Sequence, residues 1–100
     1  MSKNQNDSSP EVTHYPHEQR FVIELEGEDD AVLEYERRGP GLLDLRQTFV
    51  PESQRGNGLG GLLAKEALEY ARKMNQQVVP SCPFVKSYMD ENVEYNQLLH

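Results

Sequence analysis

The stretch of residues 50–63, VPESQRGNGLGGLL, is the part of the sequence whose residue types and spacing most clearly suggest chemistry. It places four glycines in the six positions 56–61, after a strand-like pattern and before a leucine-rich helical pattern. The first turn of a helix has unpaired backbone amides and carries the positive end of the helix dipole, and glycines let a ligand approach the backbone closely. The stretch therefore predicts an anion site, with phosphate as the expected ligand.

The spacing of the glycines argues against two common phosphate-binding turns. Gly56, Gly58 and Gly61 match the dinucleotide pattern G-x-G-x-x-G, but that pattern opens a parallel βαβ unit and needs an acidic residue about 20 positions further on. Here the preceding strands read as hairpins, and the region near Ser81 has no acid. A P-loop needs Gly-Lys-Ser/Thr, whereas two leucines follow the last glycine.

A third phosphate-binding turn fits residues 55–60, which read RGNGLG. Arg55, Gly58 and Gly60 match the pattern R/Q-x-x-G-x-G/A, which is typical of loops that bind the pyrophosphate of acyl-CoA. A flexible connector is the alternative interpretation of the glycines. However, Gly60 and Gly61 lie inside the helical pattern, where each costs about 0.5–1 kcal/mol relative to alanine, and this cost favours a close approach to the backbone.

At this point the sequence resembles the GNAT superfamily of acetyl-CoA-dependent N-acetyltransferases. The resemblance extends over about residues 12–88 and is greatest to a minimal single-domain subgroup, the YjdJ-type proteins. Three segments carry it: DLRQTFV at residues 44–50, RGNG at residues 55–58 and SCPFVK at residues 81–86. The glycine turn is a weak signal by itself, but together with the order of elements and the SCPFVK segment it is specific for the family.

The resemblance implies acetyl-CoA as the cofactor and a set of residues that bind it. In the GNAT fold, the strand before the turn and the strand after the helix splay apart, and pantetheine lies between them. The backbone of Phe49 and Val50 would contact pantetheine, and Pro80, which has no amide to donate, is tolerated in a splayed strand. The pyrophosphate loop would comprise Gln54, Arg55, Gly56, Asn57, Gly58, Leu59 and Gly60. Arg55 and Lys86 are the cations best placed to meet the CoA phosphates, with solvated surface charge as the alternative.

Acetyl transfer needs a neutral amine, a polarised thioester carbonyl and a proton for the departing thiolate. Tyr88 lies near the position where the superfamily often has a tyrosine acid, and a packed aromatic is its alternative role. Cys82 follows the last strand, so we expect it close to CoA, either as a neighbour of the thioester, as a transient acyl acceptor or as a small buried hydrophobe. Gln47 stands where the subgroup commonly has histidine, so a base is missing there. Glu52 and Asp44 are possible substitutes, with a solvated face as their alternative.

These residues lead to two hypotheses of different class. The first is an N-acetyltransferase in which an unidentified amine attacks acetyl-CoA directly, and the second is a non-catalytic CoA-binding or protein-interaction module on the same scaffold. A domain without any ligand is a third and weaker alternative. Seventeen acidic residues against ten basic ones give a net charge of −7, which argues against nucleic acid or anionic membranes as partners. We expect a small-molecule or lysine-type amine acceptor, and a chain that acts as a monomer.

The elements that would hold this site begin with an antiparallel meander. From Arg20, alternation places Phe21, Ile23 and Leu25 on one face of a strand. A turn at residues 27–30 and a second strand over residues 31–36 follow, and GPG at residues 39–41 breaks the pattern again. A third strand covers residues 42–50, with Leu43, Leu45, Gln47 and Phe49 predicted on one face. Residues 12–17 are a candidate for a short strand before the meander.

The second half of the chain predicts a long helix, a short strand and a short helix. Apolar residues recur at helical spacing from about residue 58 to Met74, and Asn75 can adopt the left-handed conformation that ends a helix. Residues 76–80 form a short apolar strand, and Pro83 suits the first position of a second helix. Past Asn92 we expect little regular structure. The fold class is therefore α+β, with the GNAT-like order of meander, long helix, splayed strand and short second helix.

One hundred residues have room for one domain. We assign residues 1–11 to a disordered tail, residues 12–92 to the acetyl-CoA-binding domain and residues 93–100 to a C-terminal tail. The sequence has one cysteine, no apolar signal segment and no apolar run long enough to span a membrane, which together predict a cytoplasmic protein. His14, His17 and His100 are expected to be surface residues, and no metal site is predicted because no cysteine or carboxylate cluster accompanies them.

Overall fold

The computed structural model describes residues 10–100, so most of the predicted N-terminal tail lies outside the described residues. Five strands form one mixed sheet in the order β2-β3-β4-β5-β6. The strands are β2 (Thr13–Tyr15), β3 (Arg20–Ile23), β4 (Ala31–Arg37), β5 (Leu42–Phe49) and β6 (Gln77–Val79). The first four pair antiparallel with their chain neighbours, which confirms the predicted meander and the short strand before it.

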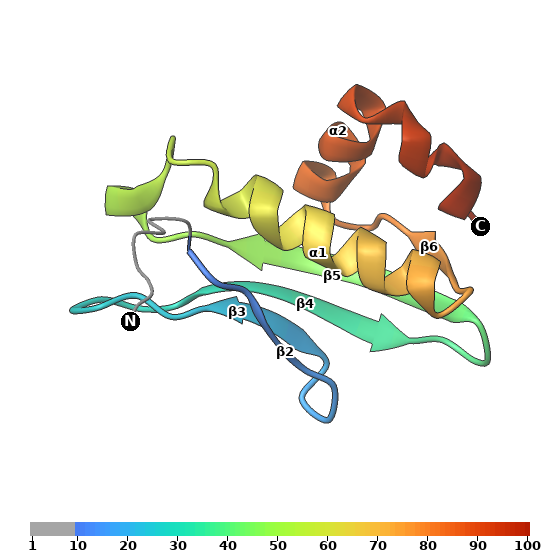
Figure 1. The fold of residues 1–100 in the computed structure, drawn as a ribbon, viewed down its shortest axis with the longest axis horizontal. Helices are drawn as coiled ribbons and strands as arrows, with labels where there is room; N and C mark the ends of the chain where they lie inside the picture. Colours follow the sequence, from blue (N-terminus) through green and yellow to red (C-terminus); the bar gives the residue numbers. More distant parts are fainter. Residues whose placement is uncertain (1–9) are drawn as a thin grey trace, which may run out of the picture.

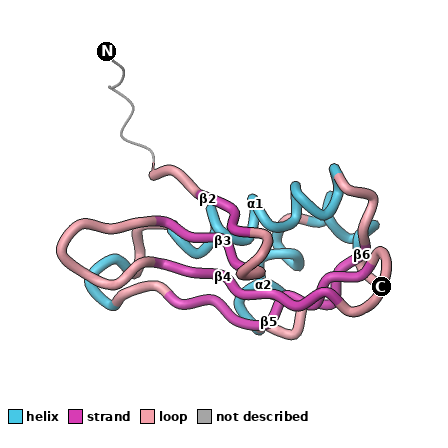
Figure 2. Tube along the Cα trace, turned by 90° about the horizontal axis from the view of Figure 1, so that it is seen from below, coloured by secondary structure: helices cyan, strands magenta, loops and turns pink. Residues whose placement is uncertain are grey.

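The helices of residues 10–100 all lie on one face of this sheet (Figure 1). They are the long helix α1 (Leu59–Lys73), the second helix α2 (Pro83–Glu91) and two short 3-10 helices, η1 (Glu52–Gln54) and η2 (Val93–Leu98). Figure 2, seen from below, shows strands β2 to β5 side by side in their chain order. The architecture is the α+β fold that the sequence predicted.

Helix α1 packs on the sheet through an apolar stripe. Its buried residues recur at helical spacing and join side chains of β3, β4 and β5 in one core. Met74, predicted to share this stripe, is instead 50% exposed because α1 ends at Lys73. Asn75 has a φ of 58° and terminates the helix as predicted. The stripe comprises Leu59, Gly60, Leu63, Ala64, Ala67, Leu68 and Ala71.

Strands β5 and β6 are joined by α1 and pair in parallel over only three residue pairs, from Leu42 with Gln77 to Asp44 with Val79. Pro80 follows immediately and has no amide to extend the ladder. The next backbone contact between the two segments is the hydrogen bond from Cys82 N to Leu45 O, at 2.9 Å. Beyond this bond the two segments separate, as the splayed strand of the sequence analysis requires.

A β-bulge in β5 changes which side chains face the helices. Glu34 of β4 is opposite Gln47, but the next residue, Tyr35, is opposite Leu45, so Arg46 is an extra residue in β5. Side chains beyond the bulge change faces because the strand period is two. The prediction that Gln47 and Phe49 share the face of Leu45 is therefore wrong. Thr48, which is opposite the buried Leu33, faces the helices in their place.

The C-terminal residues are more ordered than the sequence analysis expected. Residues 93–98 form η2, and Tyr95 and Leu98 are buried in the core. The Tyr95 hydroxyl donates a hydrogen bond to Glu69 of α1, at 2.6 Å. Leu99 then bridges to Val78 of β6, and His100 N donates to Val78 O at 3.0 Å. The expectation of little regular structure past Asn92 is thus corrected, because two apolar side chains anchor a helix too short to show a periodic pattern.

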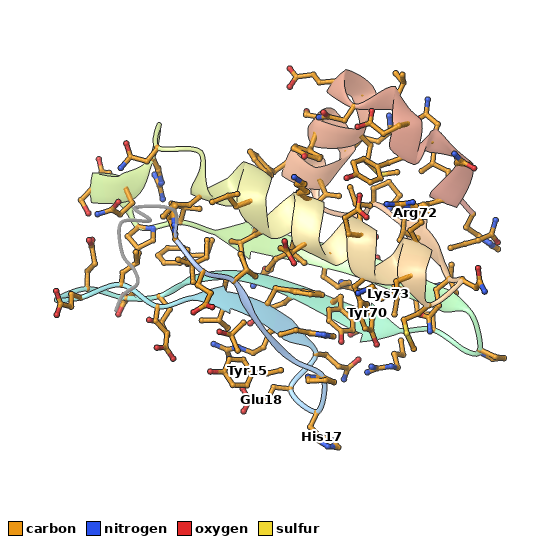
Figure 3. The ribbon with its side chains drawn as sticks, in the orientation of Figure 1. Tyr15, His17, Glu18, Tyr70, Arg72 and Lys73 are labelled. Atoms are coloured by element: carbon orange, nitrogen blue, oxygen red, sulfur yellow. The ribbon has the colours of Figure 1, made fainter. Side chains whose placement is uncertain are left out.

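His14 is also not the surface histidine that the sequence analysis expected. Its ring stacks on Phe21 at a centroid distance of 4.0 Å and meets Tyr70 edge-on at 4.4 Å. His14 Nε2 lies 2.7 Å from the Tyr35 hydroxyl. Tyr70 extends from α1 toward the sheet, whereas His17 points outward from the β2–β3 turn (Figure 3). His14 therefore joins strand β2 to the aromatic part of the core.

Burial, followed by the charge of Arg37, lowers the pKa of His14 from its ordinary value of 6.5. The folded state therefore prefers neutral His14, and its stability should fall as the pH falls from above 6.5 toward the lowered pKa. In urea unfolding at pH 7.5 and pH 5.5, H14F should lose less stability between the two pH values than the wild type. H17Q, which changes an exposed histidine, should keep the wild-type difference. An unchanged pH dependence in H14F would contradict the assignment.

Candidate functional site

A pocket of about 550 Å³ opens where β5 and β6 have separated. Its walls come from the end of β5, the glycine turn, the first turn of α1 and the start of α2. The lining residues are Thr48, Phe49, Val50, Gln54, Arg55, Gly56, Gly58, Leu59, Gly60, Gly61 and Phe84. The predicted cofactor residues from Phe49 to Gly60 thus gather around one pocket, with the exception of Asn57.

The backbone of the glycine turn has features that would suit an anion. Gly56 and Gly58 have φ values of 92° and 82°, which residues with a Cβ rarely adopt. Gly58 is the N-cap of α1, so no side chain caps the helix, and its first turn contains no acidic residue. The first hydrogen bond inside the helix runs from Leu62 N to Gly58 O, at 3.1 Å. The amides before Leu62 lie at the positive end of the helix dipole beside the pocket.

Arg55 is the cationic residue in the lining of this pocket. Its Nε donates a hydrogen bond to Val50 O at 2.9 Å, so the side chain folds back across the turn toward β5. Asn57 points elsewhere and donates from Nδ2 to Gln54 Oε1, at 3.0 Å. The turn therefore presents one positive side chain and a row of backbone amides, a combination that suits a phosphate or pyrophosphate group.

The close approach predicted at the helical glycines is made by an aromatic ring. A Cβ placed on Gly60 would lie 2.8 Å from Cζ of Phe84, which is too short for a normal contact. A Cβ on Gly61 would lie 3.6 Å from Cε1 of Tyr88, an ordinary contact. Phe84 and Tyr88 are four residues apart on α2 and so share the helix face that meets the start of α1. The sequence analysis missed Phe84 as a wall of the pocket, although this spacing was a signal for it.

Cys82 and Thr48 meet at the point where the strands diverge. Cys82 is the N-cap of α2 and is only 3% exposed. Its Sγ lies 3.5 Å from Thr48 Oγ1, and Thr48, unlike Cys82, lines the pocket. The thiol thus sits behind the pocket wall, which matches the buried alternative more closely than direct exposure to a ligand. Thr48 was missed by the sequence analysis because only the bulge turns it toward this side.

Tyr88 is half-buried against the first turn of α1 and next to Tyr95, with ring centroids 6.3 Å apart. Burial raises the pKa of Tyr88, and the negative charges of Glu94 and Glu69 raise it further. The phenol is therefore protonated at neutral pH, which is the state that a proton donor requires.

Like Tyr88, four other candidates lie outside the pocket lining. Lys86 pairs with Asp90 one turn along α2, with 3.1 Å between Nζ and Oδ1. Gln47 donates from Nε2 to Glu34 Oε1 at 3.0 Å. Asp44 is 1% exposed rather than on a solvated face, and it accepts hydrogen bonds from Ser81 at 2.5 Å and Arg38 at 3.1 Å. Glu52 is exposed in η1.

Comparisons with known proteins agree with this geometry. A family model described as GCN5-related N-acetyl-transferase matches residues 20–98. Protein NATD1 of Gallus gallus is 35% identical over 83 residues, which cover 82% of this chain and 76% of that protein. Protein NATD1 of Homo sapiens is 35% identical over 82 residues, which cover 81% and 73%. The sequence-based family assignment is thereby confirmed, whereas the YjdJ-type subgroup stays a prediction.

A solved structure shares the fold. The NMR solution structure of a GCN5-like protein from Staphylococcus aureus superposes with a TM-score of 0.72 and 26% sequence identity, covering 93% of this chain and 90% of that one. Within residues 10–100, no helix is both long and apolar enough to cross a membrane.

The different surroundings of Gly60 and Gly61 give a test of the packing between α1 and α2. G61A should raise the free energy of unfolding by up to about 1 kcal/mol, because alanine favours a helix and its methyl group has room. G60A should gain less or lose stability, because Phe84 must move away. Chemical denaturation measures both variants. In an F84A background the difference between them should disappear. Equal stabilisation by both variants with Phe84 present would contradict this packing.

Proposed function

The chain belongs to the GCN5-related N-acetyltransferase family, and from this premise we propose that it binds acetyl-CoA in the pocket beside the glycine turn and transfers the acetyl group to an amine. The observation that carries the proposal is the uncapped N-terminus of α1, which opens into a pocket formed by the separation of β5 and β6. Bound acetyl-CoA would supply the activated thioester.

The residues present fit the polar groups of CoA. The amides of the glycine turn and the Arg55 guanidinium suit the pyrophosphate, since both favour negative charge at the same end of the pocket. Phe49 and Val50 line the part of the pocket next to β5, where the peptide-like amides of pantetheine would need backbone partners. Arg55 Nε donates a hydrogen bond to Val50 O in this structure. We therefore expect the Arg55 side chain to turn toward the phosphates when CoA binds.

Tyr88 is the residue that we propose as the proton donor to the departing thiolate. Its raised pKa keeps the phenol protonated, and its ring lies against Gly61, which lines the pocket. For Cys82 the buried position favours a supporting role beside Thr48, and transient acyl transfer to the thiol stays the alternative. Lys86 as a phosphate ligand would have to leave Asp90, so we rank Arg55 above it.

A non-catalytic CoA-binding module is the second candidate function, and a specific observation favours it. Gln47 bonds to Glu34, and the carboxylate of Asp44 is buried and bound by Ser81 and Arg38. The amide of Gln47 is not a base, the buried carboxylate of Asp44 is not free to take a proton from an amine, and Glu52 lies outside the pocket lining. For the catalytic hypothesis, the acceptor would have to arrive already neutral or lose its proton to water. Given the net charge of −7, we propose a cationic amine, such as a polyamine or a lysine side chain, as the acceptor.

Thermal unfolding with and without acetyl-CoA tests the cofactor site. Ligand at about 100 times its Kd should add about 2.7 kcal/mol to the stability of the wild type, whereas NAD and ATP should add little. G58V should lose this gain, because valine blocks the approach to the turn and strains a φ of 82°. G41V is the matched control, since Gly41 has a φ of 77° in a turn outside the pocket lining. A wild type that acetyl-CoA does not stabilise would refute the proposed cofactor.

Replacement of Tyr88 by phenylalanine tests the proton donor. Y88F should lower turnover with an amine panel by about 100-fold, the usual size of a general acid contribution, and leave the affinity for CoA unchanged. Y15F is the control, because Tyr15 lies on strand β2, whereas the Tyr88 ring lies next to Gly61 of the pocket lining. Steady-state kinetics and calorimetric titration give the two quantities. Full turnover in Y88F would assign the tyrosine a packing role.

A further inference from the structure

The turn between β3 and β4 makes a polar contact with the segment that leads into the glycine turn. Glu28, next to Gly27 in this hairpin, accepts hydrogen bonds from the Ser53 hydroxyl and from Gln54 Nε2, the latter at 3.0 Å. These partners are 25 and 26 residues away in the sequence and belong to η1. The hairpin tip and η1 lie at the same end of the molecule in both views (Figures 1 and 2).

Gln54 links Glu28 to the glycine turn through hydrogen bonds at both ends of its side-chain amide. Gln54 Nε2 donates a hydrogen bond to the Glu28 carboxylate, and Gln54 Oε1 accepts one from Asn57 Nδ2 at 3.0 Å. Asn57 lies between Gly56 and Gly58, and its backbone amide donates to Gln54 O at 3.3 Å. The carboxylate of Glu28 is thus linked through one side chain to the middle of the turn.

The glycine turn needs such an external support. Gly56 and Gly58 have positive φ values, and the space where their Cβ atoms would stand is empty to 4 Å. Glycine loses more conformational freedom on ordering than any other residue, so a turn of this composition is easily disordered. A fixed partner that holds Gln54 and Asn57 reduces the number of conformations available to the free turn.

The charge state of Glu28 agrees with this role. The hydrogen bonds from Ser53 and Gln54 lower the pKa of Glu28, so the carboxylate is ionised at neutral pH and accepts both bonds. An ionised carboxylate is a stronger acceptor than a neutral group.

We propose that Glu28 is a positioning residue that holds the glycine turn, through Gln54 and Asn57, in the conformation that receives the CoA pyrophosphate. The identity of the ligand in this inference rests on the proposed function. The effect of Glu28 on the conformation of the ligand-free turn does not. The direction of the change in CoA affinity on removal of Glu28 distinguishes a positioning role from simple charge repulsion. A negative charge near an anion site should weaken anion binding by simple repulsion, so removal of that charge alone should tighten CoA binding. Removal of a positioning residue should weaken it.

Calorimetric titration of the full chain with CoA separates the two effects. E28A should weaken CoA binding about tenfold, the size expected from the loss of one or two hydrogen bonds. E28Q retains one acceptor oxygen and should fall between E28A and the wild type. E26Q is the matched control, because it removes the same charge from the same hairpin at an exposed residue, and its affinity should stay equal or rise. Equal or tighter binding by E28A would overturn the proposal.

Amide NMR spectra of the ligand-free protein supply the second measurement. In E28A the amides of Gly56 and Gly58 should exchange with water several-fold faster than in the wild type, at an unchanged thermal midpoint, whereas E26Q should leave them unaltered. Unchanged exchange at both glycines in E28A would overturn the inference even if CoA binds. If the wild type binds no CoA, the proposed function fails, and the exchange rates still decide whether Glu28 holds the turn.

Discussion

The short parallel pairing of β5 with β6 is the constraint on which the candidate site depends. The ladder covers three residue pairs, after which Pro80, which has no amide, follows the end of β6, and a bulge interrupts β5. Cys82 N still bonds to Leu45 O, so the two segments are held together at the point where they begin to separate. Asp44, bonded to Ser81, reinforces the same junction from a buried position. The pocket lies beyond this junction, because β5 and the segment after β6 are hydrogen-bonded up to Cys82 and separate past it.

The bulge at Arg46 determines which β5 side chains face the opening between β5 and β6. Without the extra residue, Gln47 would face the helices; with it, Thr48 takes that place and meets Cys82. The first turn of α2 then lies against the first turn of α1, which is possible because Gly60 leaves room for the ring of Phe84. Backbone irregularity on one side of the pocket and a missing side chain on the other thus define its walls. Both features are local, and neither adds to the core.

The sequence predicted the parts of the molecule that follow from local patterns. The meander, α1 and α2 were found because their apolar residues repeat with the period of a strand or a helix, and the glycine turn because its residue types are unusual. The face of Thr48 was not predictable, since a bulge depends on the partner strand and has no period of its own. The helix at residues 93–98 was not predicted, because two buried side chains in a 3-10 helix make no recognisable repeat. His14 was misread because its aromatic partners come from β3, β4 and α1.

The pairing of Leu99 and His100 with Val78 covers part of the sheet edge formed by β6. An uncovered sheet edge presents free amides and carbonyls that can pair with a strand of another molecule, which is a common start of aggregation. At the β6 edge, the C-terminal residues occupy part of this surface through a bridge and a hydrogen bond. At the opposite edge, β2 is only three residues long. Within residues 10–100, both borders of the sheet therefore offer little continuous backbone for intermolecular strand pairing, and removal of the last two residues would take this protection away at the β6 edge.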